Sequence, residues 1–250
     1  MNHSESRQKN NRVSLFELPL DIGIDSKGVL ARLDTDHLLL SYLNPYAYSI
    51  AKSDQTYASK LGRFDLVVCD GIGIQTAVEA VFRLTTPIIS LDYSGIGHDY
   101  LQAGSDRGNS LCLVGSKNDI VETAADKLRR EYPGFKEISA FSGYGESPEH
   151  ARGFIQREKP EMVLIGLGMG RQEAYLLELV DSGWNGVGIC VGGFFDKLAK
   201  PQLNYPKWSE KTRIRFLGRL VREPRRLSRR YFIDYQPFIK KYLKYKLSRH

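Results

Sequence analysis

The chain has 250 residues, of which 42% are hydrophobic and 26% are charged, a composition typical of a globular protein and not of a disordered one. Its net charge of +7 is uneven: residues 207–250 hold fifteen Lys and Arg against three Asp and Glu, which leaves 21 basic and 26 acidic residues elsewhere. No uncharged apolar run approaches the roughly 18–20 residues of a membrane-spanning helix, and the polar residues 1–12 lack the apolar stretch of a secretory signal. We therefore expect a cytoplasmic protein with a disordered leader at residues 1–12.

Short apolar runs alternate along the chain with longer stretches of helical periodicity. Six runs are expected to be strands: 37–43, 66–69, 111–114, 136–141, 162–167 and 187–191. Five stretches are expected to be helices: 46–61, 74–82, 117–132, 148–158 and 172–182. This alternation predicts an α/β fold, a Rossmann-like, mostly parallel sheet with helices on both faces.

The pattern changes at Trp208, after which the chain is rich in arginine and shows no strand. We expect an α/β domain at residues 13–207 and an Arg- and Lys-rich helical appendage at 208–250. Aromatic residues recur there every three or four positions, largely off the lysines: Tyr231, Tyr235, Phe238, Tyr242 and Tyr245. Such a stripe is typical of an amphipathic helix that lies on an anionic membrane surface. The alternative is that it packs against the body of the protein or another subunit, with Pro237 kinking this helix or opening a second one.

The cysteines and histidines give no sign of a disulfide framework or a zinc site. Cys69, Cys112 and Cys190 are odd in number and each sits in an apolar run, which favours buried thiols. The histidines show no metal-ligand spacing with them.

Residues that follow the apolar runs are the first candidates for a functional site, because parallel sheets bind ligands beyond the carboxyl ends of their strands. Asp70 ends the run 66–69, and Gly71 and Gly73 follow it. A carboxylate beside backbone that only glycine leaves approachable is placed to meet a ligand. Asp70 could equally cap the following helix.

Glycines follow two further runs. Three alternate after 162–165, among them Gly168, and Arg171 comes next; exposed N–H groups at a helix start favour phosphate, although tight strand–helix packing explains the pattern equally well. Gly192 and Gly193 follow the last run, with Asp196 one helical turn on.

Two nucleotide-enzyme motifs are missing or misplaced. The first strand leads into a turn without glycine, so the dinucleotide fingerprint is absent. Asp34 and Asp36 form a D-x-D of the kind that holds a divalent metal, but they precede a strand and so lie at the wrong edge of the sheet. We expect no metal site.

Taken together, these segments resemble glycosyltransferase family 26, the WecG/TagA/CpsF group of bacterial surface-polysaccharide enzymes, over roughly residues 34–230. The motifs that carry the resemblance are Asp70-Gly-Ile-Gly73, Leu113-Val-Gly-Ser116, Gly143-Tyr144, Gly168-Met-Gly-Arg-Gln-Glu173, Val191-Gly-Gly-Phe-Phe-Asp196, Pro206-Lys-Trp208 and Arg219-Leu-Val-Arg-Glu-Pro-Arg-Arg226. The resemblance implies inverting transfer from a UDP-sugar to a polyprenyl-diphosphate-linked saccharide, in biosynthesis of the exopolysaccharide, capsule or teichoic acid type. The enzyme would act on the inner face of the cell membrane, without a metal or any cofactor besides the donor.

The resemblance also assigns roles by position. Asp70 would be the catalytic base with Asn44 close by, and Gln172 and Glu173 would lie in the nucleotide pocket. The other expected substrate-binding residues in the body are Gly71, Gly73, Gly168, Arg171, Gly192, Gly193 and Asp196. Four tail arginines would reach over the diphosphate: Arg219, Arg225, Arg226 and Arg229.

The chain departs from the family pattern around the presumed sugar pocket. Tyr42 stands where the family usually has Thr, Ser94 replaces an Arg, Gly170 replaces a Pro, and Arg215 with Phe216 replaces an acidic residue and Trp. The identity of the donor sugar and of the acceptor therefore cannot be inferred from better-known members.

The predicted chemistry is simple in physical terms. One carboxylate that takes the acceptor's proton contributes ~10²–10⁴-fold, and guanidinium groups can stabilise a leaving diphosphate in place of a metal. The alternative function is a nucleic-acid-binding protein that uses the basic aromatic tail. The acidic body speaks against it, so we expect no nucleic-acid partner.

Overall fold

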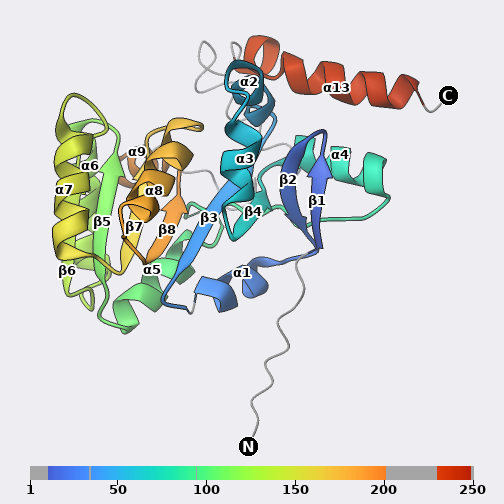
Figure 1. The fold of residues 1–250 in the computed structure, drawn as a ribbon. Coiled ribbons are helices and arrows are strands. Elements are labelled where there is room, and N and C mark those ends of the chain that lie inside the picture. The colour runs from blue at the N-terminus through green and yellow to red at the C-terminus, as the bar shows by residue number, and fades with distance from the viewer. Residues whose placement is uncertain (1–10, 34, 94, 201–229, 249–250) are drawn as a thin grey trace, which may run out of the picture.

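The computed structural model describes residues 11–33, 35–93, 95–200 and 230–248 (Figure 1). Its centre is a parallel sheet of six strands in the order β4-β3-β8-β7-β5-β6. Their bounds are β3 (Leu38–Leu43), β4 (Leu66–Cys69), β5 (Ser110–Gly115), β6 (Glu137–Phe141), β7 (Met162–Gly166) and β8 (Val187–Cys190). All the expected strands are confirmed to within one residue at each end.

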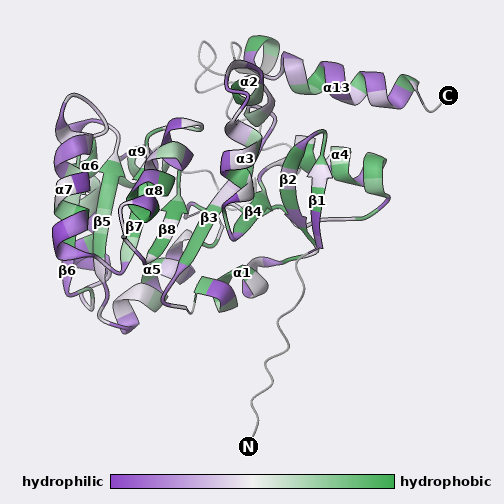
Figure 2. Ribbon diagram, viewed as in Figure 1, coloured by the Kyte–Doolittle hydropathy of each residue, from purple (hydrophilic) through white to green (hydrophobic). Residues whose placement is uncertain are grey.

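Helices cover both faces of this sheet, as expected. One face packs against α4 (Ile72–Phe82), α7 (Ser147–Glu158) and α8 (Arg171–Asp181). The other packs against α1 (Ser26–Leu33), α5 (Gly97–Asp106), α6 (Asn118–Glu131) and α9 (Phe194–Ala199). Figure 2 shows the strands as hydrophobic and the covering helices as mixed, which is the pattern of a sheet buried on both sides.

The expected helix at 46–61 is two helices, α2 (Ala47–Ser53) and α3 (Tyr57–Gly62). The break lies at Asp54, whose Oδ1 accepts hydrogen bonds from the backbone N–H of Thr56 at 2.9 Å and from its hydroxyl at 2.6 Å. Such local bonds compete with helix continuation and start a new helix instead.

A hairpin precedes the sheet, and the sequence did not predict it. It consists of β1 (Asn11–Leu15) and β2 (Leu18–Ile22), so residues 11 and 12 of the expected leader belong to a strand. The turn residues Phe16 and Glu17 both have positive φ, 48° and 76°. Such a turn is normally marked by Asn-Gly, which is absent here.

The C-terminal appendage is described from residue 230. A π-helical turn, η2 (Arg230–Asp234), leads into α13 (Gln236–Leu247), which Pro237 opens. Phe238 is 6% exposed and packs on Tyr48, with ring centroids 5.2 Å apart, and the Tyr245 hydroxyl donates to the carbonyl oxygen of Val81 at 3.3 Å. The stripe residues Phe238 and Tyr245 therefore pack on the body, as the alternative predicted, and not on lipid. No helix in the described part of the chain is long and apolar enough to cross a bilayer.

Candidate active site

The candidate site lies at the carboxyl edge of the sheet, where the loops after all the strands meet. β5 and β7 are neighbours, yet their connections leave in opposite directions, toward β6 and β8. Such a switch point is where open α/β sheets bind ligands. In Figure 1 this edge faces α2 and the start of α13.

Asp70 and Asn44 lie side by side at one end of this edge. Leu43 and Cys69 are register partners in β3 and β4, so the residues after them are adjacent, and the Asp70 N–H donates to the Leu43 carbonyl oxygen at 2.9 Å. Asn44 is 4% exposed, and its Oδ1 accepts the N–H of Tyr46 at 2.9 Å. Asn44 thus supports the turn into α2, whereas Asp70 is half-buried.

Three of the expected glycines border open space. A Cβ added at Gly71, Gly168 or Gly193 would meet no described atom within 4 Å. At Gly73 it would lie 2.9 Å from Pro45 Cγ, so this glycine packs the Asp70 loop onto the Asn44 loop. The first three can let a ligand approach the backbone, and the fourth is a packing glycine.

Gly170 and Gly192 are held in conformations that other residues rarely adopt. Their φ angles are +89° and +56°. Proline, which the resemblance implies at position 170 in other members, cannot reach such a φ, so the glycine here fits the conformation of its loop. A Cβ at Gly192 would lie 2.6 Å from the Tyr42 hydroxyl, at the position of another departure.

Gln172 and Glu173 are fully buried, each 0% exposed. Glu173 Oε1 accepts hydrogen bonds from Ser41 Oγ at 2.9 Å and Gln172 Nε2 at 3.0 Å, and its Oε2 accepts the Gly170 N–H at 2.6 Å. Burial raises the pKa of Glu173, although these hydrogen bonds oppose the shift. Both side chains hold glycine loops from within, and their contact with a nucleotide stays a prediction.

The first turn of α9 is tied to neighbouring loops. Asp196 Oδ2 accepts a hydrogen bond from Ser116 Oγ at 3.1 Å, and Lys197 forms an ion pair with Asp92. Asp196 was predicted from the sequence, whereas Ser116, Lys197 and Asp92 were not predicted as neighbours of the site. Ser116 follows strand β5 directly, which is the signal that would have found it; nothing local marks Asp92.

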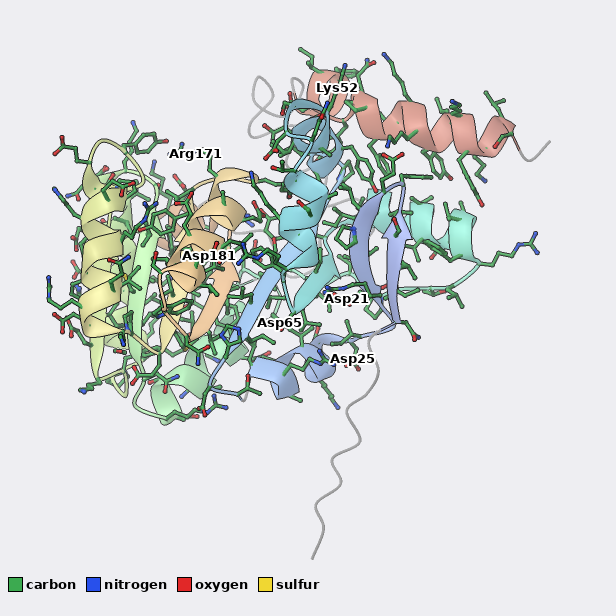
Figure 3. All side chains as sticks on the ribbon, viewed as in Figure 1. Asp21, Asp25, Lys52, Asp65, Arg171 and Asp181 are labelled. Carbon is green, nitrogen blue, oxygen red and sulfur yellow. The ribbon has the colours of Figure 1, made fainter. Side chains whose placement is uncertain are left out.

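Arg171 is the exposed first residue of α8. Figure 3 shows it on the same side of the molecule as Lys52 of α2. A Cβ at Gly170 would lie 3.0 Å from Ile50, which places α2 against the start of α8. A helix N-terminus with an adjacent guanidinium favours an anion.

Several predictions fall outside the described residues or concern metals. The predicted site residues outside the described part of the chain are Arg215, Arg219, Arg225, Arg226, Arg229 and Ser94, together with Asp34 of the D-x-D motif.

The other acid of that motif, Asp36, precedes β3 and so lies at the opposite edge of the sheet from Asp70. Among the described residues, no group of three or more His, Cys, Asp or Glu could hold a metal ion. All three cysteines are buried free thiols, as expected.

Comparison with known proteins adds an independent observation. Residues 13–250 match the profile of the glycosyl transferase WecG/TagA/CpsF family. A Shigella boydii UDP-Gal:alpha-D-GlcNAc-diphosphoundecaprenol beta-1,4-galactosyltransferase is 28% identical over 82% of this chain and 85% of its own length. The N-acetylglucosaminyldiphosphoundecaprenol N-acetyl-beta-D-mannosaminyltransferases of Bacillus subtilis (strain 168) and Staphylococcus aureus (strain MW2) are 26% and 24% identical, over 76% and 81% of this chain and 74% and 79% of theirs.

Proposed function

The chain belongs to the WecG/TagA/CpsF family of glycosyltransferases, and from that premise we propose that it transfers a sugar from a UDP-sugar to a saccharide on undecaprenyl diphosphate. The observation that carries this proposal is the half-buried Asp70 at the carboxyl edge, next to glycine loops that border open space. The relatives act on undecaprenol-linked sugars by name. The family membership favours this enzyme over a nucleic-acid-binding protein.

In this proposal Asp70 removes the proton of the acceptor hydroxyl as it attacks the donor sugar. A single base on the face opposite the leaving group gives inversion. The relatives' names specify β products, which an α-linked UDP-sugar yields only by inversion.

The diphosphate of the donor binds at the other loops. Gly168 and Gly193 leave room for it, and the start of α8 with Arg171 supplies positive potential. The tail arginines 219, 225, 226 and 229 complete this charge in the proposal, so that no metal is needed at the leaving group.

In this proposal the enzyme meets its lipid-linked acceptor at the inner face of the cell membrane, and α13 offers a surface for that contact. Ile239, Leu243 and Leu247 are 43%, 52% and 78% exposed and share one helical face. Lys240 and Lys244 flank this apolar face. Apolar side chains beside lysines fit an anionic membrane surface.

A groove beside this face supports the same placement. It lies between α2 and the start of α13 and is lined by Lys52, Phe232, Ile233, Gln236, Pro237 and Lys240. Ser49 of α2 contacts the carbonyl oxygen of Asp234 by a hydrogen bond, so α2 links the membrane side to the start of α8. The membrane surface and the donor loops therefore lie on one side of the molecule.

The test is release of UDP from a panel of UDP-sugars, with a short-chain polyprenyl-diphosphate GlcNAc as acceptor. We expect release with one donor that depends on the acceptor, and a lipid-linked disaccharide as product. Absence of UDP release with every donor, or release without sugar transfer, contradicts the proposal.

A further inference from the structure

Three buried polar side chains form a cluster beneath the donor loops: Ser41, Gln172 and Glu173, which we call the buried cluster. We propose that Glu173 is a positioning residue, which fixes the Gly170 and Gly192 loops in the conformation that binds the donor without touching the donor itself. This inference rests on the proposed function, because it concerns the same donor site.

The buried cluster joins strand β3 to the loops after β7 and β8 by hydrogen bonds. Glu173 accepts from Ser41 in β3 at 2.9 Å and from the Gly170 N–H after β7 at 2.6 Å. Gln172 donates to Glu173 at 3.0 Å, and its own Oε1 accepts the Gly192 N–H after β8 at 3.2 Å. One carboxylate thus holds both glycine loops, one directly and one through its neighbour.

Burial excludes direct contact with a ligand in this conformation. Gln172 and Glu173 have 0% of their surface exposed. A buried carboxylate is tolerated only where donors satisfy it, and here three donors do so. The role left for Glu173 is therefore to orient the loops.

The two loops need such support because of their backbone. Gly170 and Gly192 have φ angles of +89° and +56°. Their N–H groups point inward to the buried cluster, while Gly168 and Gly193, close to them in sequence, border open space. Fixing one glycine in each loop sets the direction of the backbone that is left for the diphosphate.

The same region supplies a matched control. The Tyr57 hydroxyl is buried and has no hydrogen-bond partner among the described residues. Burial is the largest cause that raises the pKa of Tyr57, and the nearby charge of Glu173 is the second. Tyr57→Phe therefore removes a buried hydroxyl group close to Glu173 without removing a hydrogen bond. Glu178→Gln is a second control, because Glu178 lies on α8 but pairs with Arg152 at the surface.

The test is calorimetric titration of the full chain with UDP, together with donor and acceptor KM values. Glu173→Gln keeps the shape but places an amide N–H₂ among donors, so we expect UDP binding about tenfold weaker and donor KM raised alike, with acceptor KM unchanged. Ser41→Ala removes one hydrogen bond and should shift UDP binding about threefold in the same direction, which keeps the test usable if Glu173→Gln does not fold. Both controls should bind UDP like the wild type.

Two results overturn the inference: wild-type UDP affinity in a folded Glu173→Gln and in Ser41→Ala, or equal losses for donor and acceptor. A wild-type protein that does not bind UDP contradicts the proposed function instead. The two failures are therefore distinguishable.

Discussion

Two places along the carboxyl edge use the same kind of side chain in opposite ways. At the β4 end, the Asp70 carboxyl group is half-buried beside a glycine that borders open space. Near the middle of the edge, in the helix after β7, the Glu173 carboxyl group is fully buried and accepts three hydrogen bonds from inside the protein. We therefore propose opposite roles for these two acidic residues: chemistry for the half-buried Asp70 and scaffolding for the fully buried Glu173.

The largest effect is expected at the open end. Asp70→Asn removes the proposed base and keeps the side-chain volume, so the rate of sugar transfer should fall ~10²–10⁴-fold. The measurement is kcat from the UDP-release assay. Asp36→Asn, at the opposite edge of the sheet, is the control and should retain the wild-type rate; a similar loss there would remove the contrast.

The support of the Asp70 loop by the C-terminal helix gives the next effect. Phe238 packs on Tyr48 and lies 3.7 Å from where a Cβ on Gly73 would be. Phe238→Ala should destabilise the docking of α13 by about 3–5 kcal/mol at most, the range for buried Phe-to-Ala changes. We expect faster amide hydrogen exchange in α13 and α4. Unchanged exchange, compared with an exposed Ile239→Ala control, would show that α13 does not support this end.

The outer face of α13 gives a smaller effect that leaves the fold intact. Leu243→Glu removes an exposed apolar side chain, worth about 1.5–3 kcal/mol when fully buried, so binding to anionic vesicles should weaken about 10–100-fold. Its thermal unfolding should match the wild type. Tyr242→Phe, on the inner face, is the control; undiminished vesicle binding by Leu243→Glu would refute the membrane surface.

The burial of Glu173 predicts a modest dependence of the protein's stability on pH. Burial raises the pKa of Glu173 above its ordinary 4.5, so at pH values between the unfolded and the native pKa the native state binds more protons than the unfolded state. The stability that this proton gives is full below the unfolded pKa and is lost as pH rises through the raised native pKa. Denaturant unfolding from pH 4 upward should show this decline for the wild type and not for Glu173→Gln. Parallel curves would contradict it.

The sequence predicted the sheet well because each strand is an apolar run bounded by turn residues. It could not predict the β1–β2 hairpin, since Phe16 and Glu17 carry no turn signal and Phe16 packs on Phe238, far along the chain. It predicted Asp70 as a site residue from its place after a strand, and that role stays a prediction. Helical periodicity predicted the aromatic stripe of α13, but it could not predict which part of the protein packs against that stripe.

The role of Glu173 could not be predicted from the sequence for a similar reason. Glu173 occupies the first turn of a helix after a glycine loop, a place equally suited to ligand contact and to internal support. Its partner Ser41 lies 132 positions away in the sequence. Only the fold brings them together, and the burial of the carboxylate supports the positioning role that we propose for it.

The most direct test of the contrast between the two acids is a UDP titration of Asp70→Asn and Glu173→Gln side by side. The account predicts that Asp70→Asn binds UDP within about twofold of the wild type while transfer is lost, and that Glu173→Gln binds it about tenfold more weakly. Loss of UDP binding in Asp70→Asn, or unchanged binding in Glu173→Gln, would contradict it.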